Sequence, residues 1–86
     1  MTKNQTIKKS RLEEAKHFLE EAAEKWPSEF LTREDAVVFS GKAISVGHLA
    51  NLDSARLGPK GSFFIGRRRV YAKKPFVDWL LSRLEV

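Results

Sequence analysis

Three consecutive arginines, Arg67 to Arg69, are the residues whose type and spacing most directly indicate a chemistry. They follow Gly66 and lie between two short apolar runs, so the pattern predicts the tip of a β-hairpin. Adjacent guanidinium groups repel one another in a free protein, whereas a polyanion attracts them all. A narrow DNA minor groove concentrates negative potential and attracts inserted arginine. We therefore expect Arg67 or Arg68 in such a groove and Arg69 against a phosphate.

The positive charge of the chain is concentrated in one segment. Sixteen Lys and Arg residues against eleven Asp and Glu leave a formal net charge of +5 on 86 residues. Residues 42–74 carry eight basic side chains and one acid, Asp53, whereas residues 1–25 intersperse six basic and five acidic side chains. A block of one sign is typical of a surface that binds an anionic partner. We expect duplex DNA to dock on residues 42–74.

The segment before the arginines predicts a short helix that could read DNA bases. Ser45 is a predicted N-cap, and the apolar positions that follow assign one face of the helix to the core. Those core positions are Val46, Leu49, Ala50 and Leu52. The side chains left facing outward can hydrogen-bond base edges or phosphates, and a glycine lets the backbone approach closely. These candidate readers are Ser45, Gly47, His48, Asn51 and Arg56.

Lys42 and Lys60 flank this helix and are expected phosphate contacts, which set the register of a DNA-binding protein without reading sequence. Two of the readers have ordinary alternatives. Asn51 is equally explained as a surface amide of a helix, and His48 as a surface histidine.

A longer helix is predicted before this region. Ser10-Arg11-Leu12-Glu13 has the pattern of a capping box, so the helix is expected to begin at Arg11. Its apolar positions recur every three or four residues, and Pro27 ends it. We expect residues 1–27 to form a tail and a helix packed on a domain of residues 28–86.

That domain is predicted to be mainly α-helical with a small β-hairpin. Thr32 caps a second short helix, which ends at Ser40-Gly41, where glycine can adopt the left-handed conformation. Pro75 suits the first turn of a closing helix. The core face of that last helix is predicted to contain Phe76, Trp79, Leu80 and Leu84.

The same residues argue against an enzyme. His17 and His48 are the two histidines, and there is no cysteine, so the sequence offers neither a catalytic triad nor a metal cluster. We expect no catalytic residue, no metal and no cofactor. No apolar run approaches the length of a membrane span, and the lack of cysteine is typical of a reducing compartment. We expect a cytoplasmic protein with no membrane partner.

An ordered series of short motifs spans residues 30–84. The series is Leu31-Thr32, Glu34-Asp35-Ala36, Ser40-Gly41, Ile44-Ser45, Leu49-Ala50-Asn51-Leu52, Gly58-Pro59, Phe64-Ile65-Gly66-Arg67-Arg68, Val70-Tyr71 and Trp79-Leu80. It resembles the small excisionase and AlpA-like regulators, whose winged helix-turn-helix belongs with the MerR-like superfamily. Asp53 stands where such sequences commonly carry an arginine. The predicted helix of residues 10–26 lies outside the resemblance.

The resemblance implies a bacterial, phage or mobile-element protein associated with the nucleoid. Its recognition helix would enter the major groove, and its hairpin wing the neighbouring minor groove. Many such proteins are recombination directionality factors, which bend attachment-site DNA and bias a tyrosine integrase toward excision. A transcriptional regulator would use the same residues. A protein-interaction adaptor that acts through residues 10–26 is a third alternative.

We also expect several copies to bind DNA together. One helix and one wing read only a few base pairs, which is too little specificity for a genome. Acidic residues outside the basic segment could meet the basic flank of a neighbour, head to tail along the duplex. These acids include Glu29, Glu34, Asp35 and Asp78.

Overall fold

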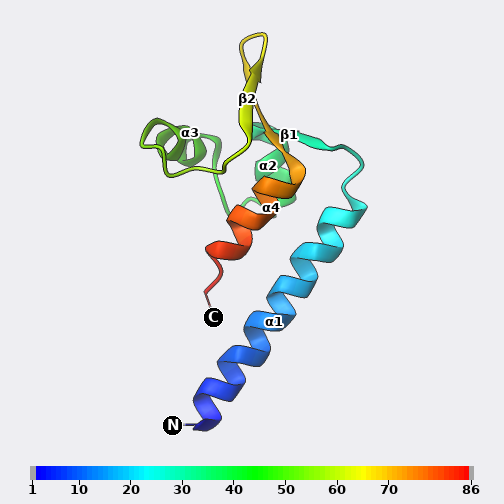
Figure 1. Cartoon of the computed structure of the whole chain (residues 1–86), viewed down its shortest axis with the longest axis vertical. Coiled ribbons are helices and arrows are strands. Elements are labelled where there is room, and N and C mark those ends of the chain that lie inside the picture. Colours follow the sequence, from blue (N-terminus) through cyan, green and yellow to red (C-terminus); the bar gives the residue numbers. More distant parts are fainter. Residues whose placement is uncertain (1, 86) are drawn as a thin grey trace.

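The computed structural model describes residues 2–85, which form four α-helices and a three-stranded antiparallel sheet (Figure 1). The helices are α1 (Thr2–Lys25), α2 (Arg33–Phe39), α3 (Val46–Ser54) and α4 (Lys73–Ser82). The strands are β1 (Phe30–Thr32), β2 (Ser62–Ile65) and β3 (Arg68–Ala72). The prediction of a mainly helical chain with a small hairpin is confirmed at this level.

The first helix is longer than predicted. It begins at Thr2, not at Arg11, so Ser10 lies in its interior instead of capping it. Residues 2–9 contain neither glycine nor proline, so nothing in the chain interrupts the helix upstream of Ser10. The helix ends at Lys25, two residues before Pro27, which agrees with the predicted stop.

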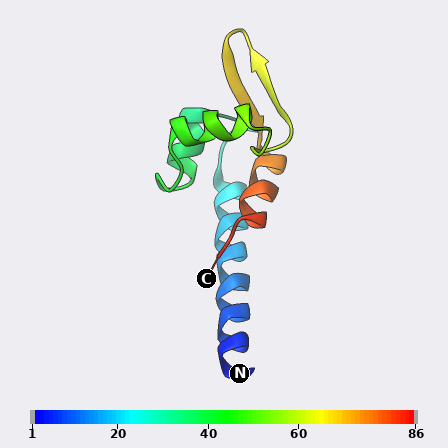
Figure 2. The same ribbon diagram turned by 90° about the vertical axis from the view of Figure 1, so that its left-hand side faces the viewer.

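The C-terminal end of α1 is fixed to the rest of the chain. Leu19 and Trp26 pack against the core, and the Trp26 ring meets Phe39 edge to face with ring centres 5.6 Å apart. The ammonium group of Lys73, at the start of α4, donates a hydrogen bond to the Trp26 carbonyl at 3.3 Å. The N-terminal half of α1 extends past the end of α4, away from the sheet (Figures 1 and 2).

The sheet has the order β1-β3-β2, so β3 lies in the middle. The predicted hairpin tip of residues 66–69 is too long. Ile65 pairs with Arg68 and Phe64 with Arg69, so the turn consists of Gly66 and Arg67 alone. Gly66 has φ +64°, as the first central residue of a tight two-residue hairpin turn commonly does. The strand pairing therefore places Arg68 and Arg69 on β3 and leaves Arg67 at the tip.

The core lies where the helices meet one face of the sheet. Its buried members are Leu31, Ala36, Leu49, Tyr71, Phe76 and Leu80. Phe76 and Leu80 confirm the predicted core face of α4, and Pro75 lies in its first turn as predicted. Leu84 was predicted on the same face but lies beyond the end of the helix at Ser82. Val46, in contrast, was predicted to be in the core and is 39% exposed. It is the first residue of α3, and the core contact of this helix is made one turn later by Leu49.

Candidate nucleic-acid interface

The helix pair α2–α3 is defined by local hydrogen bonds. Thr32 and Asp35 form a capping box: the Thr32 hydroxyl accepts from the Asp35 amide, and the Asp35 carboxylate accepts from the Thr32 amide, both at 3.1 Å. At the other end of α2, Gly41 adopts φ +66° and the Lys42 amide donates to the Val37 carbonyl at 2.8 Å. This is a Schellman motif, which turns the chain sharply toward α3.

The predicted cap of α3 is confirmed. The Ser45 hydroxyl accepts a hydrogen bond from the His48 amide at 3.0 Å. This bond occupies one of the two acceptor positions of the Ser45 hydroxyl and leaves its proton free to donate. Leu49 holds the opposite side of α3 against the core. The outer face of α3 exposes three of the predicted readers, Gly47, His48 and Asn51.

The N-terminal end of α3 and the hairpin border one groove. The groove has a volume of about 280 Å³ and is lined by Arg33, Glu34, Val46, Arg67, Arg68 and Arg69. The Arg68 side chain is 71% exposed, and its Nη1 atom lies 3.7 Å from Glu34 Oε1. Because Glu34 is 66% exposed as well, this ion pair is largely hydrated and weak. The arginines predicted from sequence and the first turn of α3 therefore face a common space.

Arg69 is less exposed than Arg67 and Arg68. Alternate residues of a strand point to opposite faces, and the Arg69 side chain is only 21% exposed. Its guanidinium lies over the Phe64 ring, 4.9 Å from the ring centre. Its buried Nε atom lies 3.6 Å from Asp53 Oδ2, an ion-pair distance that is too long for a hydrogen bond. The predicted phosphate contact of Arg69 would compete with these internal contacts.

Asp53, which was not among the site residues predicted from sequence, lies beside Arg69. Its carboxylate, 5% exposed, accepts hydrogen bonds from the Tyr71 hydroxyl at 2.5 Å and from Arg33 Nη2 at 2.8 Å. Arg33 Nε also donates to the Tyr71 hydroxyl at 3.2 Å. Asp53 lies on α3, Arg33 on α2 and Tyr71 on β3. The cluster thus connects both helices to the hairpin strand, and the signal in the sequence was an isolated acid within a basic segment.

This cluster also changes the acidity of its members. Burial, followed by the hydrogen bond to Asp53, raises the pKa of Tyr71 to about 12. The hydrogen bond to Asp53, with a further one to Tyr71, raises the pKa of the Arg33 guanidinium. Gly58 leaves room for the cluster, because a Cβ atom at this position would collide with the Asp53 carboxylate.

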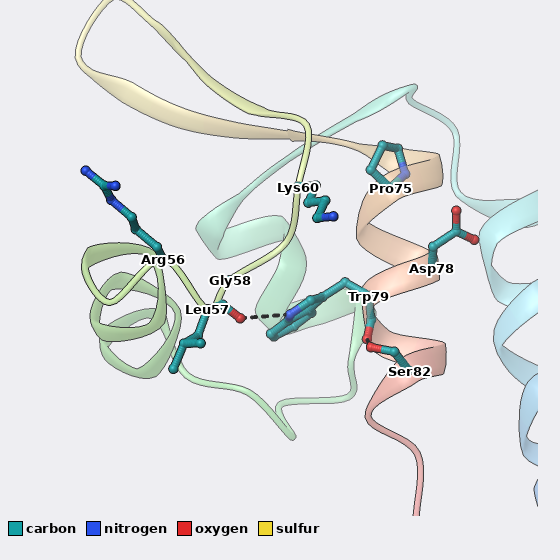
Figure 3. Close-up of a pocket in the computed structure, with 8 residues that line it drawn as sticks. All are labelled: Arg56, Leu57, Gly58, Lys60, Pro75, Asp78, Trp79 and Ser82. Carbon is teal, nitrogen blue, oxygen red and sulfur yellow. Dashed lines mark hydrogen bonds between the residues drawn. The ribbon is translucent and has the colours of Figure 1, made fainter.

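Arg56 and Lys60 lie at the other end of α3. Arg56 was predicted on the outer face of this helix, but α3 ends at Ser54 and Arg56 follows it with φ +61°. Both side chains line a pocket of about 480 Å³ against α4, where the Trp79 indole donates to the Leu57 carbonyl at 3.1 Å (Figure 3). Figure 3 shows Arg56 extending away from the Trp79 ring. Both cations are exposed.

Lys42 is exposed in the turn between α2 and α3. The neighbouring residues Ala43 and Ile44 line a groove with α1 and the end of α4. The turn therefore lies on the α1 side of the molecule, whereas the Gly66-Arg67 turn lies at the opposite end (Figures 1 and 2). The structure does not bring Lys42 together with the hairpin arginines.

Residues 2–85 contain neither a cluster of metal-ligating side chains nor a membrane-spanning helix. In this range no group of three or more His, Asp or Glu side chains is arranged to hold a metal ion. The His17 imidazole lies on α1, 3.3 Å from Glu21, and His48 lies on α3. None of the helices in the same range is long and apolar enough to cross a membrane.

Comparison of the chain with protein-family models, with curated proteins and with solved structures finds no match. The family resemblance therefore rests on the motifs of the chain itself.

Proposed function

We propose that this protein binds duplex DNA as a winged helix-turn-helix, with α2 and α3 as the helix pair and the β2–β3 hairpin as the wing. The observation that carries the proposal is the shared groove, which Arg67 and Arg68 line together with Val46, the first residue of α3. A recognition helix and a wing that face the same side can enter neighbouring grooves of one duplex.

The roles follow from exposure and chemistry. Asn51, exposed on α3, can pair with the edge of an adenine in the major groove, and Gly47 permits close backbone approach. Arg67 at the hairpin tip and the exposed Arg68 suit a narrow minor groove. His48, Ser45, Arg56 and Lys60 are assigned to bases or phosphates at the edges of this surface, which Lys42 does not join. Arg69 is assigned mainly to holding the wing through Asp53.

The charges inside the basic segment favour an anionic partner. Its one acid, Asp53, is nearly buried and paired with Arg33, so it contributes little negative potential to the surface. Glu34 opposes Arg68, but a hydrated pair at 3.7 Å is easily exchanged for a phosphate contact. The exposed cations of residues 42–74 then act together on the DNA backbone.

The resemblance favours the role of an excisionase, a recombination directionality factor that bends attachment-site DNA and acts with a tyrosine integrase. The alternative is a transcriptional regulator that uses the same surface. An excision assay with a tyrosine integrase and its attachment sites separates the two, because a regulator leaves the yield of excised circles unchanged. On DNA, neighbouring copies are proposed to pack head to tail. Glu29 and Asp78 are exposed and available for this contact, whereas Asp35 is engaged in its capping box.

The experiment that tests DNA binding is a titration of labelled duplex DNA at several salt concentrations. With about five to eight phosphate contacts, the affinity should fall by orders of magnitude between about 50 and 200 mM salt. On a natural site, several copies should bind in succession with a Hill coefficient above one. An affinity that does not change with salt would overturn the proposal and favour the adaptor alternative.

A further inference from the structure

The known packing of α1 against the core is near its C-terminal end. It is made through Leu19 and Trp26. Its first turns extend past α4 along the long axis of the molecule (Figures 1 and 2). A helical segment without tertiary contacts is only marginally stable in water. A contact from outside this chain would stabilise it.

The charges of α1 are arranged against the helix dipole. Residues 2–12 contain four basic and no acidic side chains, whereas residues 13–25 contain five acidic and two basic ones. The positive end of a helix dipole prefers the opposite distribution, and the first turn of α1 holds no acid. Two such helices in antiparallel order would place each basic half beside an acidic half. Parallel order would place like charges together.

One line along α1 is suited to this pairing. Arg11, Glu14 and Phe18 are three and four residues apart, so they lie on one side of the helix, and all are exposed. Phe18 is 64% exposed and borders an apolar groove of about 390 Å³, whose other walls include Ile44 and Leu84. The line thus reads basic, acidic, apolar.

We propose that this face of α1 pairs with α1 of a second copy of the chain in antiparallel order. With the two-fold axis between Leu12 and Glu13, Arg11 of each copy faces Glu14 of the other. This contact between Arg11 and Glu14 occurs twice by symmetry. Each copy offers few apolar side chains, so the pair is weak and forms at high protein concentration. It requires no DNA and is therefore independent of the proposed function.

Sedimentation equilibrium of the full chain without DNA tests the pairing. We expect a monomer–dimer equilibrium as the concentration rises toward the millimolar range. Glu14→Arg and Arg11→Glu each create two like-charge contacts and should raise the dissociation constant about tenfold. The double variant Arg11→Glu with Glu14→Arg exchanges the charges and should restore pairing. A chain that stays monomeric throughout would overturn the proposal.

Two controls separate this interface from general effects of charge and folding. Glu13→Arg changes the net charge as Glu14→Arg does, but Glu13 lies off the line and its replacement should leave the dissociation constant unchanged. Equal effects of both substitutions would contradict a specific interface. Circular dichroism of dilute monomers should show similar helix content for all variants. A loss of helix in the single variants that accounts for their weaker association would also overturn the proposal.

The orientation has its own test, because the chain contains no cysteine. A mixture of Arg11→Cys and Glu14→Cys chains should form a disulfide between different chains under mild oxidation. Each variant alone should crosslink less, because like positions do not face each other. Efficient crosslinking of Arg11→Cys alone would indicate parallel helices and contradict the antiparallel arrangement.

Discussion

The Tyr71 hydroxyl donates a hydrogen bond of 2.5 Å to Asp53 Oδ2, and this contact joins the hairpin strand β3 to α3. Tyr71 is fully buried, so its hydroxyl needs a partner within the protein. The same carboxylate oxygen also accepts from Arg33 of α2. Asp53 therefore links the proposed recognition helix both to α2 and to the wing, and it is an acid within the basic segment.

We predict that Asp53→Ala lowers the free energy of unfolding by about 3 kcal/mol. The substitution leaves the Arg33 guanidinium and the buried Tyr71 hydroxyl without their common acceptor, and Arg69 without its ion-pair partner. Urea denaturation measures the loss. Tyr71→Phe alone should cost about 1–2 kcal/mol. The double variant should cost less than the sum of the two, since both substitutions remove the same hydrogen bond. Additive costs would show that the two residues act separately.

The pKa of Tyr71 predicts a loss of stability in alkaline solution. Its value in the folded protein is about 12, compared with 10.0 for an unperturbed tyrosine. The folded state thus favours the neutral phenol of Tyr71, and the stability that this preference contributes is fully present below pH 10. As pH rises from 10 to 12, the unfolded chain ionises first, so the free energy of unfolding falls. Urea titrations at several pH values in this window measure the slope.

Tyr71 is the single tyrosine of the chain, so the ultraviolet absorbance of tyrosinate reports on this residue alone. In the native protein the band should appear well above pH 10. Asp53→Asn should move it to lower pH, because the Asp53 carboxylate raises the pKa of Tyr71. A native protein whose tyrosinate band appears near pH 10 would contradict the buried hydrogen bond.

The features that could be predicted from sequence are the local ones. The caps formed by Thr32 and Ser45, and the left-handed Gly41, depend on residues no more than five positions apart. The start of α1 was missed although it too is local. Ser10 has the side chain of an N-cap, but a cap acts only where the helix ends, and the upstream residues allow the helix to continue.

The features that sequence reasoning missed depend on distant contacts. Leu31 pairs with Tyr71 across the sheet, and Arg33 contacts the Asp53 carboxylate twenty positions later. No periodicity in the sequence encodes such pairs. Arg69 shows the consequence for the site: its residue type predicted a phosphate contact, but the strand register turns it toward Asp53. The residue types were enough to predict the candidate surface, but the contacts of each arginine within it depend on the tertiary fold.

The two exposed wing arginines are predicted to affect DNA binding and not stability. Arg67→Ala with Arg68→Ala should weaken duplex binding, and the slope of log affinity against log salt should decrease by about 2. The midpoint of thermal unfolding should stay nearly unchanged, because both side chains are exposed. Fluorescence anisotropy and thermal melts on the same samples measure both quantities.

Two further sets of substitutions distinguish the wing arginines from net charge and from Arg69. Lys16→Ala with Lys25→Ala removes the same charge from exposed positions of α1 and should leave the affinity almost unchanged. Arg69→Ala should instead lower the free energy of unfolding by about 1–2 kcal/mol, because it removes the contacts with Asp53 and Phe64. Equal loss of binding in the α1 double variant would show that net charge, and not the wing, determines affinity.

At Gly47 of α3, one substitution is expected to change stability and DNA binding in opposite directions. A Cβ atom at Gly47 would meet no other atom within 4 Å, and the backbone of this residue is helical. Gly47→Ala should therefore raise the free energy of unfolding by about 0.5 kcal/mol, because alanine loses less backbone entropy in a helix. If α3 lies in the major groove with its backbone close to the DNA, the added methyl group should weaken binding at the same time.

Ser10→Ala is the matched control for Gly47→Ala. Ser10 lies inside α1, exposed and far from α3, and its replacement should also raise the free energy of unfolding by about 0.5 kcal/mol. It should not change the affinity for DNA. We expect Gly47→Ala to raise stability and lower the affinity for DNA, and Ser10→Ala to raise stability alone. This combination would assign the loss of affinity to contact between α3 and DNA. If Gly47→Ala binds as tightly as the unmodified chain, the first turn of α3 does not approach the duplex.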